Sequence, residues 1–147
     1  MKGLIQLAMI LVLAACGNSD EQDSDDTDQQ GACGEVTVHS LNVSGLVLMS
    51  DGSAVGASGV TVSLEDRGWN PGEVLAQVQT NEDGEFLLAE AAVTSVVDCW
   101  GTLLNYVVVA ESALGRAEKE VNTALFNAIR DGESTVDLRD VPLLLEN

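Results

Sequence analysis

The sequence offers few side chains that could do covalent or acid–base chemistry. Its single histidine, His39, lies on the polar side of the alternating segment EVTVHS, and no nucleophile motif stands beside it. The chain has no Gly-x-Ser-x-Gly pattern, no phosphate loop and no zinc-type cluster of cysteines and histidines. Paired carboxylates are unavoidable among 24 acids, so composition leaves glycosidase-type chemistry open, but the small size and the lack of aromatic lining argue against it. We therefore predict a protein that is not an enzyme and has no catalytic residue, metal or cofactor.

Cysteine is the other reactive residue type, and the first of three lies where the composition changes abruptly. Lys2 precedes the nearly unbroken apolar run Leu4–Ala15, and Cys16 then opens an acidic stretch. A helix that crosses the roughly 30 Å hydrocarbon core needs about 20 apolar residues. A run of twelve residues therefore predicts a signal peptide over residues 1–15 rather than a membrane span.

The residues Leu13–Cys16, which read Leu-Ala-Ala-Cys, resemble the lipobox of bacterial lipoproteins. That resemblance implies cleavage before Cys16, a diacylglyceryl group on its thiol and an acylated new N-terminus. Two or three acyl chains give stable membrane anchorage, whereas one holds a protein only marginally. Gly17 stands where enteric lipoproteins retained in the inner membrane carry aspartate, so the resemblance favours the outer membrane, on its periplasmic or its surface-exposed face.

The stretch after the lipobox is strongly acidic. Residues 17–32 contain six acids, no basic residue and no apolar residue larger than alanine. Such a segment cannot bury enough surface to offset its chain entropy, so residues 16–32 are predicted to be a disordered tether. The formal net charge of −18 excludes nucleic acid as a partner, because phosphate binding depends on clustered lysine and arginine.

With Cys16 assigned to lipid, the other two cysteines allow one pairing. An exported chain would join Cys33 to Cys99 as a disulfide, and closing a loop of this length should contribute roughly 4 kcal/mol. Zinc is the competing interpretation. It is disfavoured because the chain has one histidine and no Cys-x-x-Cys pair.

Alternation of apolar and polar residues dominates the rest of the chain. In GVTVSLED the apolar face is Val60, Val62 and Leu64, and in EVTVHS it is Val36 and Val38. Further β-rich runs are GLVLM, VLAQVQT, EFLLAE and NYVVVAE, separated by turn clusters such as DRGWNPGE and NEDGE. This spacing predicts one all-β domain, an antiparallel β-sandwich of about seven strands.

One segment departs from the alternating pattern. Ala124–Gly132 carries apolar residues at helical spacing, which predicts a short helix before a last strand in STVDLRDV. The domain boundaries that follow are a signal peptide over 1–15, a tether over 16–32 and a β-sandwich over 33–147.

The stretch Val43–Leu88 resembles the carboxypeptidase regulatory-like domain, a transthyretin-like or Ig-like sandwich. The positions that match that family's pattern are Gly45, Val47, Gly52, Gly59, Val60, Val62, Thr80, Asn81, Gly84 and Phe86. In carboxypeptidases this module is an accessory beside a separate zinc-bearing domain. The family's usual Pro-Gly turn after Phe86 is missing, so the strand order beyond that point stays open.

The matching turn has a structural interpretation that needs no ligand. Gly84 supplies the left-handed backbone of a tight hairpin, Asn81 can bond the turn backbone, and Phe86 is predicted to anchor the core. The alternative is a calcium site built from Asn81, Asp83 and Glu85.

Tryptophan supplies the remaining candidate for a contact residue. Trp69 lies in the turn DRGWNPGE and is predicted to be exposed, either as a hairpin cap or as a platform for a sugar or a partner. Trp100 follows Cys99 and is predicted to pack on the disulfide.

Together these features predict a lipid-anchored envelope lipoprotein that acts as an accessory, structural or partner-binding module. The alternatives are a carbohydrate-binding module at the cell surface and a secretion-machinery lipoprotein of the type VI kind, whose small lipoprotein also resembles a transthyretin-like sandwich. The partner, an envelope protein or a glycan, is not identified by the sequence.

Overall fold

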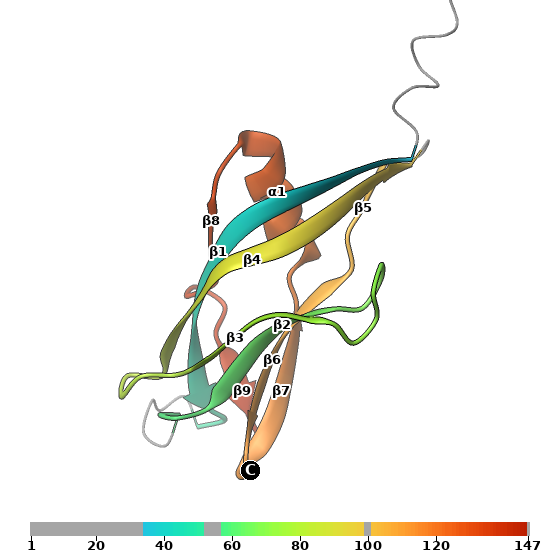
Figure 1. Cartoon of the computed structure of the whole chain (residues 1–147). Helices are drawn as coiled ribbons and strands as arrows, with labels where there is room; N and C mark the ends of the chain where they lie inside the picture. Colours follow the sequence, from blue (N-terminus) through green and yellow to red (C-terminus); the bar gives the residue numbers. More distant parts are fainter. Residues whose placement is uncertain (1–33, 52–56, 99–100, 147) are drawn as a thin grey trace, which may run out of the picture.

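The computed structural model describes residues 34–51, 57–98 and 101–146, which form two β-sheets and one helix (Figure 1). The elements are β1 (Glu35–Met49), β2 (Thr61–Asp66), β3 (Val74–Gln79), β4 (Glu85–Asp98), β5 (Gly101–Leu103), β6 (Tyr106–Ser112), β7 (Gly115–Glu120), α1 (Asn122–Asp131), β8 (Thr135–Asp137) and β9 (Leu143–Leu145). The first sheet has the order β5-β4-β1-β8, with β9 also pairing β1, and the second has the order β3-β2-β6-β7. The predicted all-β architecture with one short helix is confirmed at this level.

The end of the chain differs from the antiparallel arrangement that the sequence predicts. The described residues hold nine strands rather than about seven, because the predicted runs EVTVHS and GLVLM form the single strand β1, and β5, β7 and β9 were not expected. β8 and β9 both pair with β1 in parallel, through Val43 with Val136 and Val47 with Leu143. The first sheet is therefore mixed, and the predicted last strand STVDLRDV is reduced to the three residues of β8.

The hydrophobic core follows the alternation seen in the sequence. Val43 and Val47 of β1 are fully buried, and so are Val62 and Leu64 of β2, in agreement with the predicted apolar face of GVTVSLED. Each such side chain contributes about 1.5 to 3 kcal/mol relative to an exposed position. Tyr106 of β6, 1% exposed, is the largest of the fully buried side chains.

β1 and β4 pair antiparallel over most of their length, and the short β5 pairs with the end of β4 (Figure 1). We call residues 35–40 and 92–98 the outer arm. A bulge separates it from the rest of the two strands, where Glu90 has a φ of 53° and donates its N–H to Asn42 Oδ1 at 2.9 Å. The bulge adds a residue to β4, and such insertions bend a strand and increase its twist.

The outer arm corrects one prediction. Val36 and Val38 were expected on the core face, but they are 46% and 63% exposed. α1 lies against the opposite face, where Thr37 and His39 line a pocket shared with Phe126 of the helix. Periodicity alone identified the two faces of this strand but not which of them would be covered.

The helix forms close to its predicted position. α1 buries Leu125 and Ala128, two of the residues in the predicted apolar stripe. It ends at Gly132, whose φ of 71° allows its own N–H and that of Glu133 to bond the carbonyls of Ile129 and Ala128. This is the Schellman arrangement, which satisfies carbonyls that the end of a helix leaves free. Among the helices of the described residues, none is long and apolar enough to cross a membrane.

The turn between β3 and β4 has the predicted local structure, but the two strands that it connects lie in different sheets. Gly84 has a φ of 76° and its N–H donates to Asn81 O at 3.0 Å, while Asn81 Oδ1 accepts the N–H groups of Asp83 and Glu85. A hairpin within one sheet was expected. β3 instead belongs to the second sheet and β4 to the first, so the turn connects the two layers.

Candidate functional site

Trp69 lies in the loop between β2 and β3, and its side chain is 56% exposed, as the sequence predicts for this turn. The buried side chain of Asp66, which is only 2% exposed, holds the loop through hydrogen bonds. Asp66 Oδ1 accepts the N–H groups of Gly68 and Trp69 at 2.6 and 3.0 Å, and Oδ2 accepts that of Asn70 at 2.9 Å. Hydrogen bonds to an ionised group are among the stronger ones in proteins, so this carboxylate fixes the backbone of Trp69.

A second set of contacts clamps the same loop to the start of β6. Arg67 N–H donates to Asn105 O at 2.7 Å, and Asn105 Nδ2 donates back to Arg67 O at 3.2 Å. A Cβ at Gly68 would lie 2.8 Å from Asn105 Cβ, so only glycine fits between the two segments. The exposed indole is therefore presented by a backbone that is already ordered, which lowers the entropy cost of any contact it makes.

Beside the indole lies a pocket of about 410 Å³, which we call the Trp69 pocket. It is lined by the Trp69 loop, by Thr94 and Val96 of the outer arm, and by Leu104. Tyr106 completes the lining, and its hydroxyl donates to Thr94 O at 2.8 Å and accepts the Thr94 N–H at 2.9 Å. Burial raises the pKa of the Tyr106 hydroxyl above its ordinary 10.0, so it stays a neutral hydrogen-bonding group.

The apolar surface continues from the Trp69 pocket along the outer arm. Val36 is paired with Val96 and Val38 with Thr94, and directly opposed residues of an antiparallel pair point to the same face. Both β1 valines are strongly exposed, as is the indole. Contiguous exposed apolar surface next to a pocket is typical of an interaction site. Sequence reasoning found Trp69 but not the pocket, whose walls come from segments far apart in the chain.

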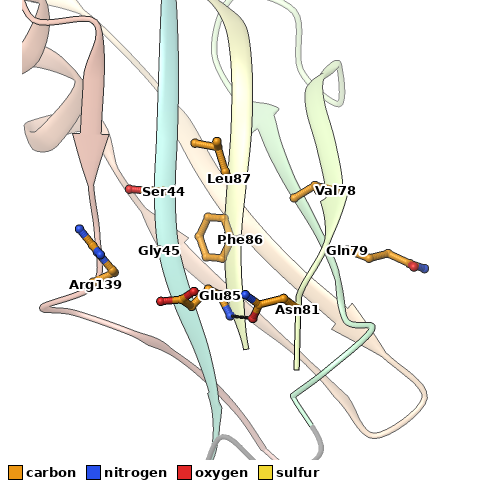
Figure 2. A pocket seen from close by; sticks show the side chains of 9 residues that line it. All are labelled: Ser44, Gly45, Val78, Gln79, Asn81, Glu85, Phe86, Leu87 and Arg139. Atoms are coloured by element: carbon orange, nitrogen blue, oxygen red, sulfur yellow. Dashed lines mark hydrogen bonds between the residues drawn. The ribbon is translucent and has the colours of Figure 1, made fainter. Parts of the chain in front are cut away.

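A second pocket, of about 360 Å³, lies where β3 and β4 diverge from their shared turn, and we call it the fork (Figure 2). Val78 and Gln79 of β3 stand on one side, and Phe86 and Leu87 of β4 on the other. Phe86 is 5% exposed, as the predicted core anchor should be, and its ring fills the space above Gly45 on the paired strand.

Polar groups at the mouth of the fork are already engaged with one another. Asn81 Oδ1 accepts two backbone N–H groups, and Asn81 Nδ2 donates to Glu85 Oε2 at 3.1 Å. Arg139 donates to both carboxylate oxygens of Asp137, and these hydrogen bonds lower the Asp137 pKa from 3.8 to about 2. The alternative calcium site at Asn81, Asp83 and Glu85 thus has an amide oxygen committed to the turn. No group of three or more potential metal ligands occurs in the residues that the structure describes.

His39 has a neighbour that the sequence did not reveal. Its Nε2 lies 2.9 Å from Ser95 Oγ, across the pair of strands that forms the outer arm. Ser95 is 4% exposed, and no carboxylate in the described part of the chain bonds the other ring nitrogen. A serine nucleophile needs both access to substrate and an oriented base. The pair therefore resembles a buried polar contact beneath α1 more than a catalytic dyad.

Several predicted residues fall beyond the structural description. The lipidation site Cys16, the disulfide partners Cys33 and Cys99, and Trp100 all lie outside the described residues. Comparison of the chain with family models, curated proteins and solved structures gives no match.

Proposed function

We propose that this protein is a lipid-anchored lipoprotein of the cell envelope, in the outer membrane, whose β-sandwich is a non-catalytic partner-binding module. The observation that carries the binding role is the Trp69 pocket, with its ordered loop and exposed indole. In this proposal the sandwich is of the transthyretin-like or Ig-like kind, and the two packed sheets support that assignment.

A partner protein fits this surface better than a small substrate does. Trp69 lines the pocket and is 56% exposed, and the exposed Val36 and Val38 are paired with two other lining residues, Val96 and Thr94, so the apolar surface extends beyond the cavity itself. Tryptophan is over-represented among interface residues whose truncation costs about 2 kcal/mol or more. Binding residues also gather on loops held by a rigid scaffold, and the Asp66 contacts make the Trp69 loop such a case.

Replacing Trp69 tests the binding role. Trp69→Ala should leave the melting temperature unchanged, because the side chain is exposed, and should weaken capture of the native membrane partner by about 30-fold. Leu114→Ala is the matched control, since Leu114 is 52% exposed but lies beyond the opposite end of β6. Equal capture by both variants would contradict the proposal. A glycan as the captured partner would instead favour the carbohydrate-binding alternative.

The anchor requires its own test, which depends on the lipobox at Leu13–Cys16. A Cys16→Ser chain should take up no fatty-acid probe and should accumulate as an unprocessed precursor. A variant that is labelled and processed normally would contradict the lipoprotein assignment, while leaving the Trp69 pocket unaffected.

The non-catalytic assignment is supported by the burial of Ser95 and is tested through His39. His39→Ala should leave partner binding unchanged. If the wild-type chain hydrolysed a simple ester and His39→Ala abolished that activity, the protein would be an enzyme.

A further inference from the structure

β3 forms an open edge of the second sheet, and its backbone pattern shows which groups face outward. Thr80 N–H donates to Val60 O at 2.9 Å, and Val78 is paired with Val62, so these residues direct their backbone groups to β2. Hydrogen bonding alternates along an antiparallel strand. Gln77 and Gln79 therefore direct their N–H and C=O groups away from β2, and in the described residues no strand bonds that side of β3.

The neighbouring strand at this side of the sandwich does not pair with β3 in the described residues. β4 approaches β3 at their shared turn, where Asn81 N–H donates to Glu85 O at 3.0 Å. Beyond that bond the described parts of β3 and β4 belong to different sheets, and the fork lies between them. Figure 2 shows Val78 on the β3 side of this gap and Leu87, which is 54% exposed, on β4.

β3 also lacks two of the devices that usually protect an edge, which are charged residues and proline. Its six residues, VLAQVQ, include no charge and no proline, and Val74 is 51% exposed. Natural sheets blunt their edges with lysine, proline, bulges or covering segments. The irregularity between Leu64 and Glu65 affects only the first residue or two of β3, so the outward groups of Gln77 and Gln79 remain in a regular ladder.

The charges around β3 indicate what can pair with it. Glu73 precedes the strand, and Glu82, Asp83 and Glu85 follow it, all of them exposed. In an antiparallel pairing with a second copy, Glu73 of one chain would approach the acidic turn of the other. Like charges so placed repel, and the whole chain carries −18. A segment with basic residues at its ends meets attraction at both ends instead.

We propose that the outer edge of β3 binds an extended segment of a partner protein by β-strand addition, and that this segment has alternating apolar residues between lysines or arginines. The strand would span roughly 20 Å, from the loop that carries Trp69 to the fork. The inference rests on the partner-binding role proposed above and adds the form and charge of the partner.

The test uses the full chain and a synthetic peptide about ten residues long, with valine and threonine alternating between lysine pairs. Amide hydrogen exchange should slow at Gln77 and Gln79 when this peptide is added, and a peptide with glutamate at both ends should bind at least about tenfold more weakly. Higher salt should weaken binding of the lysine peptide, because the acidic residues around β3 are exposed and salt screens exposed charges. Equal binding of the two peptides, or protection on β7 instead of β3, would overturn the proposal.

Gln77 provides the matched variants. Gln77→Pro removes an outward N–H at an edge position, where proline is tolerated, and should reduce peptide affinity about tenfold. Gln77→Thr keeps the N–H and should bind within about twofold of wild type. If Gln77→Pro does not fold, a lysine peptide N-methylated at alternate positions must lose binding to the wild-type chain to the same degree. Unchanged binding of that peptide would overturn the proposal.

The outcomes separate this inference from the proposed function. If Trp69→Ala weakens partner capture and Gln77→Pro does not, the partner binds at the Trp69 pocket and strand addition is refuted. If sedimentation shows a dimer of the full chain that Gln77→Pro dissociates, the edge pairs with a second copy and the basic partner is refuted.

Discussion

The second sheet ends in two edge strands, β3 and β7, that differ in almost every respect. β7 reads GRAEKE, so four of its six residues are charged, whereas β3 reads VLAQVQ and has none. Arg116 of β7 lies 2.6 Å from Glu118 and 3.2 Å from Glu111 of the neighbouring strand. The C-terminal segment also packs beside β7, where Gly115 lies against the carbonyl of Glu146.

This contrast distinguishes the two sides of the sandwich. A strand with alternating charges is protected against pairing with other chains, whereas an uncharged edge is a template for it. The fork is lined by β3, the Trp69 pocket is lined by the loop that leads into β3, and β4 contributes residues to both. The β7 side thus serves as the protected boundary of the fold, and the β3 side carries the surface that we assign to partners.

The largest change in stability is expected for a substitution in the core next to β3 and β4. Phe86 is 5% exposed and fills the space above Gly45 at the base of the fork, so Phe86→Ala should lower the free energy of unfolding by about 3 to 5 kcal/mol. Urea denaturation measures this loss. Phe126→Ala is the matched control, because Phe126 of α1 is 38% exposed, with Arg130 above its ring at 5.9 Å. Similar losses in both variants would show that the fork is not specially supported.

Much of this interior could be predicted from the sequence because its signals are local. Alternation in GVTVSLED correctly placed Val62 and Leu64 in the core, although Ser63 on the predicted polar face is also buried. Gly84 and Asn81 form the predicted turn that leads to Phe86. The short helix was found in the same way, from the spacing of Leu125 and Ala128.

The features that the sequence did not predict depend on contacts with residues far away in the chain. The sequence showed that β1 has two faces, but α1, more than 80 residues later, decides that His39 is covered and Val38 exposed. The parallel pairing of β8 and β9 with β1 leaves no periodic signal, and the charged β7 lacks the apolar alternation of a half-buried strand. The Trp69 pocket was missed for the same reason, since part of its lining comes from the outer arm.

An intermediate loss of stability is expected when Asp66, which holds the Trp69 loop, is replaced. Asp66→Asn keeps the shape of the side chain but turns one acceptor into a donor that faces backbone N–H groups, so it should cost roughly 2 kcal/mol. The amides of Gly68 to Asn70 should then exchange faster with solvent, and partner binding should weaken together with the order of the loop. Asp140→Asn, at an exposed position, should change stability by less than about 0.5 kcal/mol. Unchanged exchange in the Asp66 variant would mean that the loop is ordered by the Asn105 clamp alone.

The smallest effect is expected at the protected edge. Glu118 is hydrogen-bonded by Arg116, and that bond lowers the Glu118 pKa below its ordinary 4.5, but the side chain is 45% exposed. Glu118→Gln should therefore change the free energy of unfolding by no more than about 0.5 kcal/mol at neutral pH. Because the folded pKa is the lower one, the contribution of Glu118 is complete above pH 4.5 and is lost as the pH falls through the folded value.

Chemical denaturation at pH 7 and below pH 4, each with and without 1 M salt, checks that expectation for β7. The difference between wild type and Glu118→Gln should shrink at the lower pH and in salt, because both treatments weaken an exposed ion pair. A loss well above 1 kcal/mol that salt leaves intact would show that the charges of β7 stabilise the fold. In that case they could not be explained as protection of an edge, and the absence of charge on β3 would no longer distinguish a binding edge from a protected one.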